Sequence, residues 1–152
     1  MIEYHLAPWI AERVTGLTFE PVDTGGNVTV AWQPDDGLTL AVAVMPTGGQ
    51  SQPTRMSDDY PSVQIIVRGA PQDSYTPRRV AQEIHDLLHC KPGQWELAGG
   101  VTPDGDPIDP VKVEGVTALQ SVPVPLGRDA SDRHEYVVNL DFMVSHPTAH
   151  RP

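Results

Sequence analysis

The stretch that decides the fold is YPSVQIIVRGAPQDSYTPRRVAQEIHDLLH, residues 60–89. Its first half alternates apolar and polar residues, and this period of two indicates a strand with one buried face. Its second half repeats apolar residues at helical spacing, which predicts an amphipathic helix. Thr76 and Pro77 are suited to open that helix, because a hydroxyl can cap free N–H groups and proline needs no N–H at the first position. The apolar residues in question are Val63, Ile65 and Val67 in the strand and Val80, Ile84, Leu87 and Leu88 in the helix.

The chain before this stretch predicts a further helix and two strands. Residues 2–14 carry apolar residues on one helical face, with Glu3 away from it. Pro8 cannot donate a hydrogen bond to the preceding turn, so the helix either starts near Ala7 or is kinked at the proline. Residues 47–59, TGGQSQPTRMSDD, have no periodicity and predict a mobile loop, of a length that is often functional. The two strands are expected over residues 28–32 and 38–45.

The chain after this stretch is dominated by strands. The final strand has the strongest alternating apolar face of the sequence, which indicates a strand with one buried face. A glycine inside the long strand before it, Gly115, predicts a bulge. We expect a short edge strand at 94–98, followed by a turn-rich connection at 99–110. Two strands are expected at 111–122 and 135–144, with a polar connection at 126–134 that reverses the chain between them. Residues 145–152 are expected to form a frayed tail.

These patterns predict a single α+β domain over residues 1–152. Strands outnumber helices and are joined mostly by tight connections, as in an antiparallel sheet. We expect this mostly antiparallel sheet to have the two helices packed on it. The length of 152 residues is enough for one domain with its own core.

The composition argues against binding to phosphates. The net charge is −10, whereas affinity for nucleic acid depends on clustered Lys and Arg. Cys90 is the only cysteine, so no intrachain disulfide can form, and we expect it to be a small buried hydrophobe. No signal sequence and no long apolar run is evident. We therefore expect a soluble protein made in a cytoplasm, with no role in a membrane.

The segment His85-Asp86-Leu87-Leu88-His89 has the strongest resemblance to an enzymatic motif. Two histidines at positions i and i+4 can share a metal, as in zinc proteases. However, Asp86 stands where such proteases have a longer glutamate. Counting 100° per residue also places both histidines opposite the apolar stripe, on the solvent face. We expect an exposed and structurally neutral pair, and we retain a metal-dependent hydrolase built on His85 and His89 as the less favoured alternative.

Charged residues at strand ends and turns form a second candidate set. Arg68 ends the central strand, and Arg128, Asp129 and Arg133 lie in the polar reversal before the last strand. Such residues usually form surface ion pairs of little energetic value. Arginine at strand ends is also common at subunit interfaces, where its planar guanidinium pairs with carboxylates. Both interpretations remain open from the residues alone.

Two segments together resemble a known family. The first is Tyr60-Pro61-Ser62-Val63-Gln64-Ile65-Ile66-Val67-Arg68-Gly69, which is similar to the P-x-V-Q-x-x-V-R-G stretch of the tail-terminator proteins of long-tailed bacteriophages, also called minor capsid or tail-completion proteins. The second is Ala118-Leu119-Gln120-Ser121, followed by Leu126-Gly127-Arg128-Asp129 and by Arg133-His134-Glu135-Tyr136. It resembles the family's closing hairpin, L-G-R-D and then R-x-E-[FY].

The resemblance implies a structural viral protein without catalysis or cofactor. Family members are small α+β proteins that form a ring, usually hexameric, at the head-proximal end of the tail tube in the virion neck. The ring ends tube polymerisation and docks the tail to the head-completion or connector protein. The implied partners are therefore other copies of the chain, the major tail tube protein and the connector, with DNA passing through the lumen unbound. A different neck protein, a head-closure ring or an adaptor, is the alternative of the same class.

On this resemblance we expect the interface set to consist of arginines and aspartates. Arg68, at the strand end, is the first residue to test. Two groups in the 47–59 loop, Arg55 and the pair Asp58-Asp59, are suited to docking a neighbouring ring. The full expected interface set is Arg68, Arg128, Asp129, Arg133, Arg55, Asp58 and Asp59.

Overall fold

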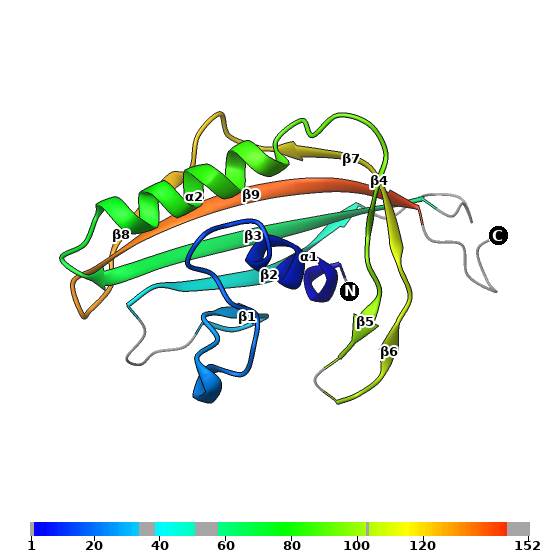
Figure 1. The fold of residues 1–152 in the computed structure, drawn as a ribbon. Coiled ribbons are helices and arrows are strands. Elements are labelled where there is room, and N and C mark those ends of the chain that lie inside the picture. Colours follow the sequence, from blue (N-terminus) through cyan, green and yellow to red (C-terminus); the bar gives the residue numbers. More distant parts are fainter. Residues whose placement is uncertain (1, 34–38, 51–57, 103, 146–152) are drawn as a thin grey trace.

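The computed structural model describes residues 2–33, 39–50, 58–102 and 104–145 (Figure 1). Two α-helices, a short 3-10 helix and nine strands lie in these ranges. Their order is α1 (Glu3–Ala11), η1 (Val22–Thr24), β1 (Val28–Val30), β2 (Ala41–Gln50), β3 (Asp58–Pro71), α2 (Tyr75–Leu88), β4 (Trp95–Leu97), β5 (Gly100–Val101), β6 (Pro107–Ile108), β7 (Val111–Ala118), β8 (Val124–Arg128) and β9 (Arg133–Ser145).

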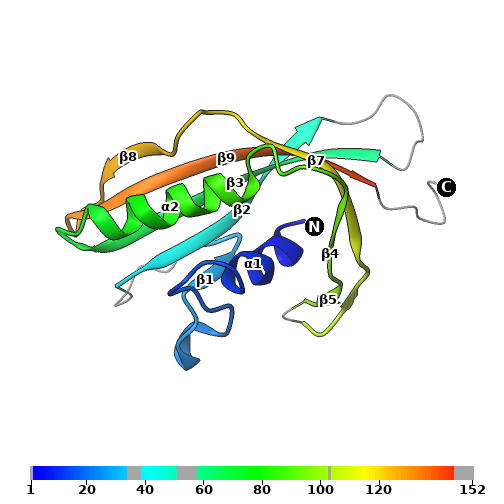
Figure 2. The same cartoon turned by 45° about the horizontal axis from the view of Figure 1, so that its top comes forward.

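Seven strands form one sheet in the order β1-β2-β3-β9-β7-β4, with β8 paired to β9. β1 and β2 are parallel, and the other described pairs are antiparallel. β5 and β6 form a separate two-stranded hairpin. The sheet is strongly curled, since β4 and β7 bend away from the long strands β2, β3 and β9 (Figures 1 and 2). The prediction of two helices and a mostly antiparallel α+β sheet is confirmed.

The centre of the sheet is the pair β3 and β9, in which Ile65 lies opposite Val138. The predicted alternation is confirmed in both strands, because inward residues such as Ile65 and Leu140 are fully buried. Inner residues of both helices, including Ile10 of α1 and Ile84 of α2, belong to the same buried cluster. Burying one such side chain contributes about 1.5–3 kcal/mol. The residues 60–89 that define the pattern thus also supply much of the core.

The start of α2 differs from the prediction. Asp73 Oδ1 accepts hydrogen bonds from the N–H groups of Tyr75 and Thr76, each at 3.0 Å. The Thr76 hydroxyl and N–H, followed by the Tyr75 N–H, lower the pKa of Asp73 below its ordinary 3.8. The helix begins at Tyr75, so the predicted capping by Thr76 and the placement of Pro77 at the first position are wrong. An aspartate just before a helix reaches the free N–H groups better than a residue already inside the first turn.

α1 runs from Glu3 to Ala11 with Pro8 inside it, within the predicted range 2–14, so of the two predicted alternatives the start near Ala7 is wrong. Glu3 was expected on the outer face but is only 8% exposed. A negative charge in the first turn of a helix is stabilised by the free N–H groups there, which favours this position for Glu3.

The structure contains strands that the sequence did not predict, β5, β6 and β8, and strand in part of the predicted 47–59 loop. β2 extends to Gln50 and β3 begins at Asp58, so the ends of the predicted 47–59 loop are strand. β8 was predicted as part of a polar connection, because Pro125 argued against a strand. Proline is tolerated in a strand that pairs on one side only. The bulge at Gly115 is confirmed by a register shift, as is the short strand β4.

Candidate functional site

Two arginines and one aspartate from separate parts of the chain meet at one end of the sheet. Arg68 Nη1 lies 3.7 Å from Asp129 Oδ2, and Arg133 Nε donates to the same oxygen at 3.0 Å. Arg68 is 4% and Arg133 7% exposed, whereas the Asp129 side chain is 20% exposed. One carboxylate is therefore shared by two buried guanidinium groups. We call Arg68, Asp129 and Arg133 the arginine cluster.

The turn between β8 and β9 fixes the position of Asp129. Its Oδ1 accepts hydrogen bonds from the N–H groups of Ser131 at 2.8 Å and Arg133 at 2.9 Å. An aspartate that bonds the backbone two residues further on is a common way to build such a turn. Arg68 arrives from the neighbouring strand, where it lies opposite Glu135. Antiparallel pairing of β3 with β9 therefore brings the two distant segments together.

The electrostatics of the cluster favour the ionised carboxylate. The Arg133 N–H, the Ser131 N–H and the charge of Arg133 together lower the pKa of Asp129 below its ordinary 3.8. Partial burial acts in the opposite direction but is outweighed. The charges of this cluster thus stabilise one another within the chain and offer no group suited to acid–base catalysis at neutral pH.

The other predicted interface residues lie in two places. Arg128 is exposed beside the cluster and pairs with Asp132 at 2.8 Å. Asp58 and Asp59 lie at the opposite end of β3, opposite Ser145 and Val144. At about 3.3 Å per residue, the two ends of β3 are separated by more than about 30 Å. Arg55 is outside the described residues. The assignment of this set to an interface remains a prediction.

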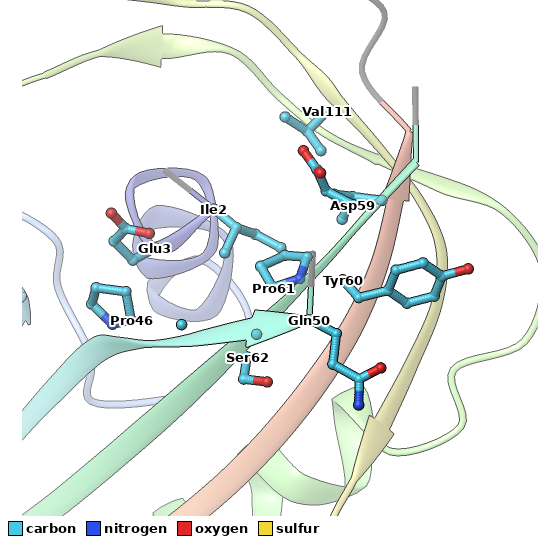
Figure 3. A pocket seen from close by; sticks show the side chains of 12 residues that line it. Ile2, Glu3, Pro46, Gln50, Asp59, Tyr60, Pro61, Ser62 and Val111 are labelled. Carbon is cyan, nitrogen blue, oxygen red and sulfur yellow. The ribbon is translucent and has the colours of Figure 1, made fainter. Parts of the chain in front are cut away.

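A pocket of about 350 Å³ lies near Asp59, where α1 meets the ends of β2 and β3 (Figure 3). It is lined by two carboxylates, Glu3 and Asp59, and by the apolar side chains of Ile2, Pro61 and Val144. None of the described residues that line it is a lysine, arginine or histidine. Such a lining accepts an apolar or cationic group better than an anion.

The predicted position of the two histidines is wrong. His85 is 4% exposed, and its Nε2 is 3.0 Å from the Gln120 carbonyl oxygen. His89 Nδ1 accepts the Ala118 N–H at 3.1 Å, and the two rings stack with centroids 5.0 Å apart. The helical-wheel prediction failed because the row of side chains that α2 buries against the core includes His85. Its members are Pro77, Val80, Ala81, Ile84, His85 and Leu88.

The histidines cover an open strand edge. β4 pairs with β7 only as far as Val113, and further along β7 the backbone groups are met by the end of α2. The Cys90 N–H donates to the Val116 carbonyl at 3.2 Å, in line with the Ala118 bond to His89. An exposed strand edge is a site of unwanted pairing, so this cover is useful to the fold. The pair has a structural role that the sequence pattern did not indicate.

Cys90 is exposed, so the prediction of a buried thiol is also wrong. The helix ends at Leu88, and Cys90 adopts a left-handed backbone conformation with φ of 51°. This conformation turns the chain toward β4 and leaves the side chain at the surface. The sequence places Cys90 next to an apolar stripe, but the stripe ends before it.

No cluster of three or more His, Cys, Asp or Glu that could hold a metal ion occurs within residues 2–33, 39–50, 58–102 and 104–145. Across those same ranges, none of the helices is both long and apolar enough to cross a membrane.

Two exposed features were missed by the sequence interpretation. Tyr75 is 72% exposed on the first turn of α2, near Arg78. Phe19, Trp32 and Val101 are exposed apolar residues that line one groove beyond β1. The spacing of Tyr75 and Arg78, three apart on a helix and outside its apolar stripe, was a signal for the first feature. No local signal joins the three residues of the groove.

No family model fits this chain, and no curated protein matches it.

Proposed function

We propose that this chain is a structural subunit of the neck of a long-tailed bacteriophage. Copies of it would form a ring, hexameric as in the family it resembles, at the head-proximal end of the tail tube. The ring would end polymerisation of the tube and dock the tail to the head connector. Its partners would be the major tail tube protein, the connector and further copies of itself. The protein would reside in the virion after synthesis in the host cytoplasm.

The observation that carries this proposal is the arginine cluster. Arg68 belongs to the V-R-G end of the first resembling segment, and Asp129 and Arg133 belong to the L-G-R-D and R-x-E parts of the second. These residues share one carboxylate in the fold, with both guanidinium groups buried. The residues that carry the resemblance are therefore parts of one three-dimensional unit, which supports a resemblance of the whole fold.

The acidic character of the chain is consistent with a channel through which DNA passes without being bound. With a net charge of −10, a ring of these subunits would repel phosphates rather than retain them. We expect charge reversal of lumen residues to slow DNA ejection. Normal ejection by such mutants would contradict this part of the proposal.

The deciding experiment is electron microscopy of particles made without this protein, with the wild-type chain supplied in trans as the control. We expect overlong tails together with free, DNA-filled heads, and restoration of normal virions by the control. Tails of normal length that fail to join heads would instead indicate a head-closure or adaptor role. Tails of normal length joined to heads would overturn the proposal.

A further inference from the structure

The outward face of α2 carries an aromatic and a cationic residue suited to a protein interface. Tyr75 is the most exposed of the large hydrophobic residues, at 72%, and Arg78 lies three residues further on. Residues three apart lie on the same side of a helix. Both line a shallow hollow along the helix together with Leu87. Tyrosine and arginine are the residue types most often found at the energetic centre of interfaces.

Arg78 is distinguished from the other cations of the chain. Among the lysines and arginines within residues 2–33, 39–50, 58–102 and 104–145, it is the one with no ion pair or cation–π contact. The others are engaged within the chain: Arg13, Arg68, Arg79, Lys112, Arg128 and Arg133 in ion pairs, and Lys91 over the rings of Trp9 and Trp95. The hollow also contains Glu83 and Asp86, but neither forms an ion pair with Arg78. In a chain with net charge −10, a cation that forms no ion pair among the described residues is available to a partner.

A complementary groove lies beyond β1, between α1, η1 and the β5 strand. It has a volume of about 470 Å³. Phe19, Trp32 and Val101, which line it, are 39%, 52% and 69% exposed. Among the described residues of the lining, Glu20 is the charged one, and none of them is a lysine or arginine. Exposed apolar residues that converge on one hollow typically mark a protein contact.

The two surfaces lie on different sides of the molecule. α2 runs along β9 and β3, whereas the groove is beyond β1, and α1 lies between them (Figures 1 and 2). They do not meet within one chain, so each copy presents both at once. A contact between unlike surfaces of identical copies is heterologous. Such contacts generate a closed ring when the rotation from one copy to the next brings the last copy back to the first.

We propose that the outward face of α2 in one copy docks into the β1 groove of the next copy, with Tyr75 in the groove and Arg78 paired with Glu20. The charges support a second copy as the occupant, since Arg78, which forms no ion pair among the described residues, complements Glu20, the carboxylate of the described groove lining. This proposal rests on the proposed ring and names the surfaces that would close it.

The test is sedimentation velocity of the purified full chain over a range of concentrations, with four variants. Arg78→Glu and Glu20→Arg should each weaken self-association by about tenfold or more, because each places like charges together. The double variant, with the charges exchanged, should recover most of the association. Lys112→Glu makes the same charge change away from both surfaces and should leave association unchanged. Thermal unfolding of each variant checks that its fold is intact.

A second measurement uses a photoreactive phenylalanine analogue at position 75. We expect crosslinks from this position to residues 19–32 or to Val101 of another copy. Association that is equal in all variants, crosslinks to other regions or to another protein only, or a wild-type chain that stays monomeric at the highest concentrations would each overturn the proposed contact. A ring that persists in every variant would overturn these surfaces and leave the proposed function intact. Normal virions made without the protein would contradict the function, whereas the crosslinks would still test the contact.

Discussion

The arginine cluster, which Arg68 joins from the strand just before α2, and helix α2 itself use polar residues in opposite ways. In the cluster, Arg68 and Arg133 are buried and share the carboxylate of Asp129. In α2, polar residues form hydrogen bonds at the two ends of the helix, Asp73 at the start and the histidines at the end. Its outward face leaves Tyr75 exposed.

The difference shows what decides whether a charged residue stabilises the fold or stays free to contact another molecule. Arg68 and Arg78 are ten positions apart and belong to the same continuous pattern. Arg68 lies on β3, next to β9, and the turn that leads into β9 places the Asp129 carboxylate beside it. Arg68 is buried in this position. Arg78 lies on the helix face that points away from every strand. Burial and the presence of a partner, both tertiary properties, separate the two residues.

The largest loss of stability is expected when the negative charge of Asp129 is removed from the arginine cluster. Asp129→Asn leaves two buried guanidinium groups without their shared anion, which is strongly unfavourable. Its pKa is lowered in the folded state, so the carboxylate stabilises the fold above the ordinary value of 3.8, and this contribution is lost as the pH falls through the folded pKa. Denaturant unfolding should show a deficit at pH 7 that shrinks below about pH 4.

The matched control for this variant is Asp132→Asn. Asp132 lies in the same turn and pairs with the exposed Arg128, both side chains being more than 40% exposed. The same chemical change there should have little effect at any pH. Equal effects of the two substitutions would contradict the special role of Asp129.

A smaller loss is expected where α2 covers the edge of β7. His89→Leu removes the acceptor of the Ala118 N–H, and an unsatisfied backbone donor costs about 1–2 kcal/mol. His89→Asn can keep an acceptor near the position of Nδ1 and should recover part of this loss. Unfolding free energies and the hydrogen exchange of the Ala118 amide would measure the effect. Unchanged exchange in His89→Leu would show that the bond is unimportant.

At the other end of α2, we expect a loss of about 1 kcal/mol for Asp73→Ala, the usual effect of removing a helix cap. Asp73→Asn retains a capping oxygen and should lose only a few tenths of a kcal/mol. Thermal unfolding would separate the two. A larger effect of Thr76→Ala than of Asp73→Ala would support the original prediction that Thr76 caps the helix.

The smallest effect on the monomer is expected for Arg78→Ala. An exposed residue without an intramolecular partner changes the unfolding free energy by less than about 0.5 kcal/mol. The variant should therefore leave unfolding unchanged while weakening self-association. A clear loss of monomer stability would mean that Arg78 contributes to the fold, which would remove the contrast with Arg68.

Much of the fold was predictable because it depends on local periodicity. The alternation in β3 and β9 indicates which side of each strand is buried, and the apolar spacing of α2 indicates a helix. The bulge at Gly115 and the short strand β4 were found in the same way. β8 was missed because its prolines exclude a central strand, whereas a strand paired on one side accepts them.

The candidate site was less predictable. The sequence selected Arg68, Asp129 and Arg133 as a set, but it contained no measure of their burial or of the shared oxygen. It placed His85 on the wrong face because the buried stripe of a helix depends on what the helix packs against, and His85 meets the carbonyl of Gln120, just after β7. The groove beyond β1 joins residues from four separate segments, and no local pattern relates them.

By itself, the sequence determined the secondary structure of the central segments and the acidic character of the chain. These properties follow from composition and from the order of neighbouring residues. The tertiary structure alone decided which charges are satisfied within the chain and which remain exposed. The physical reason is that burial and pairing depend on strands and turns distant in sequence, such as the turn that brings Asp129 to Arg68.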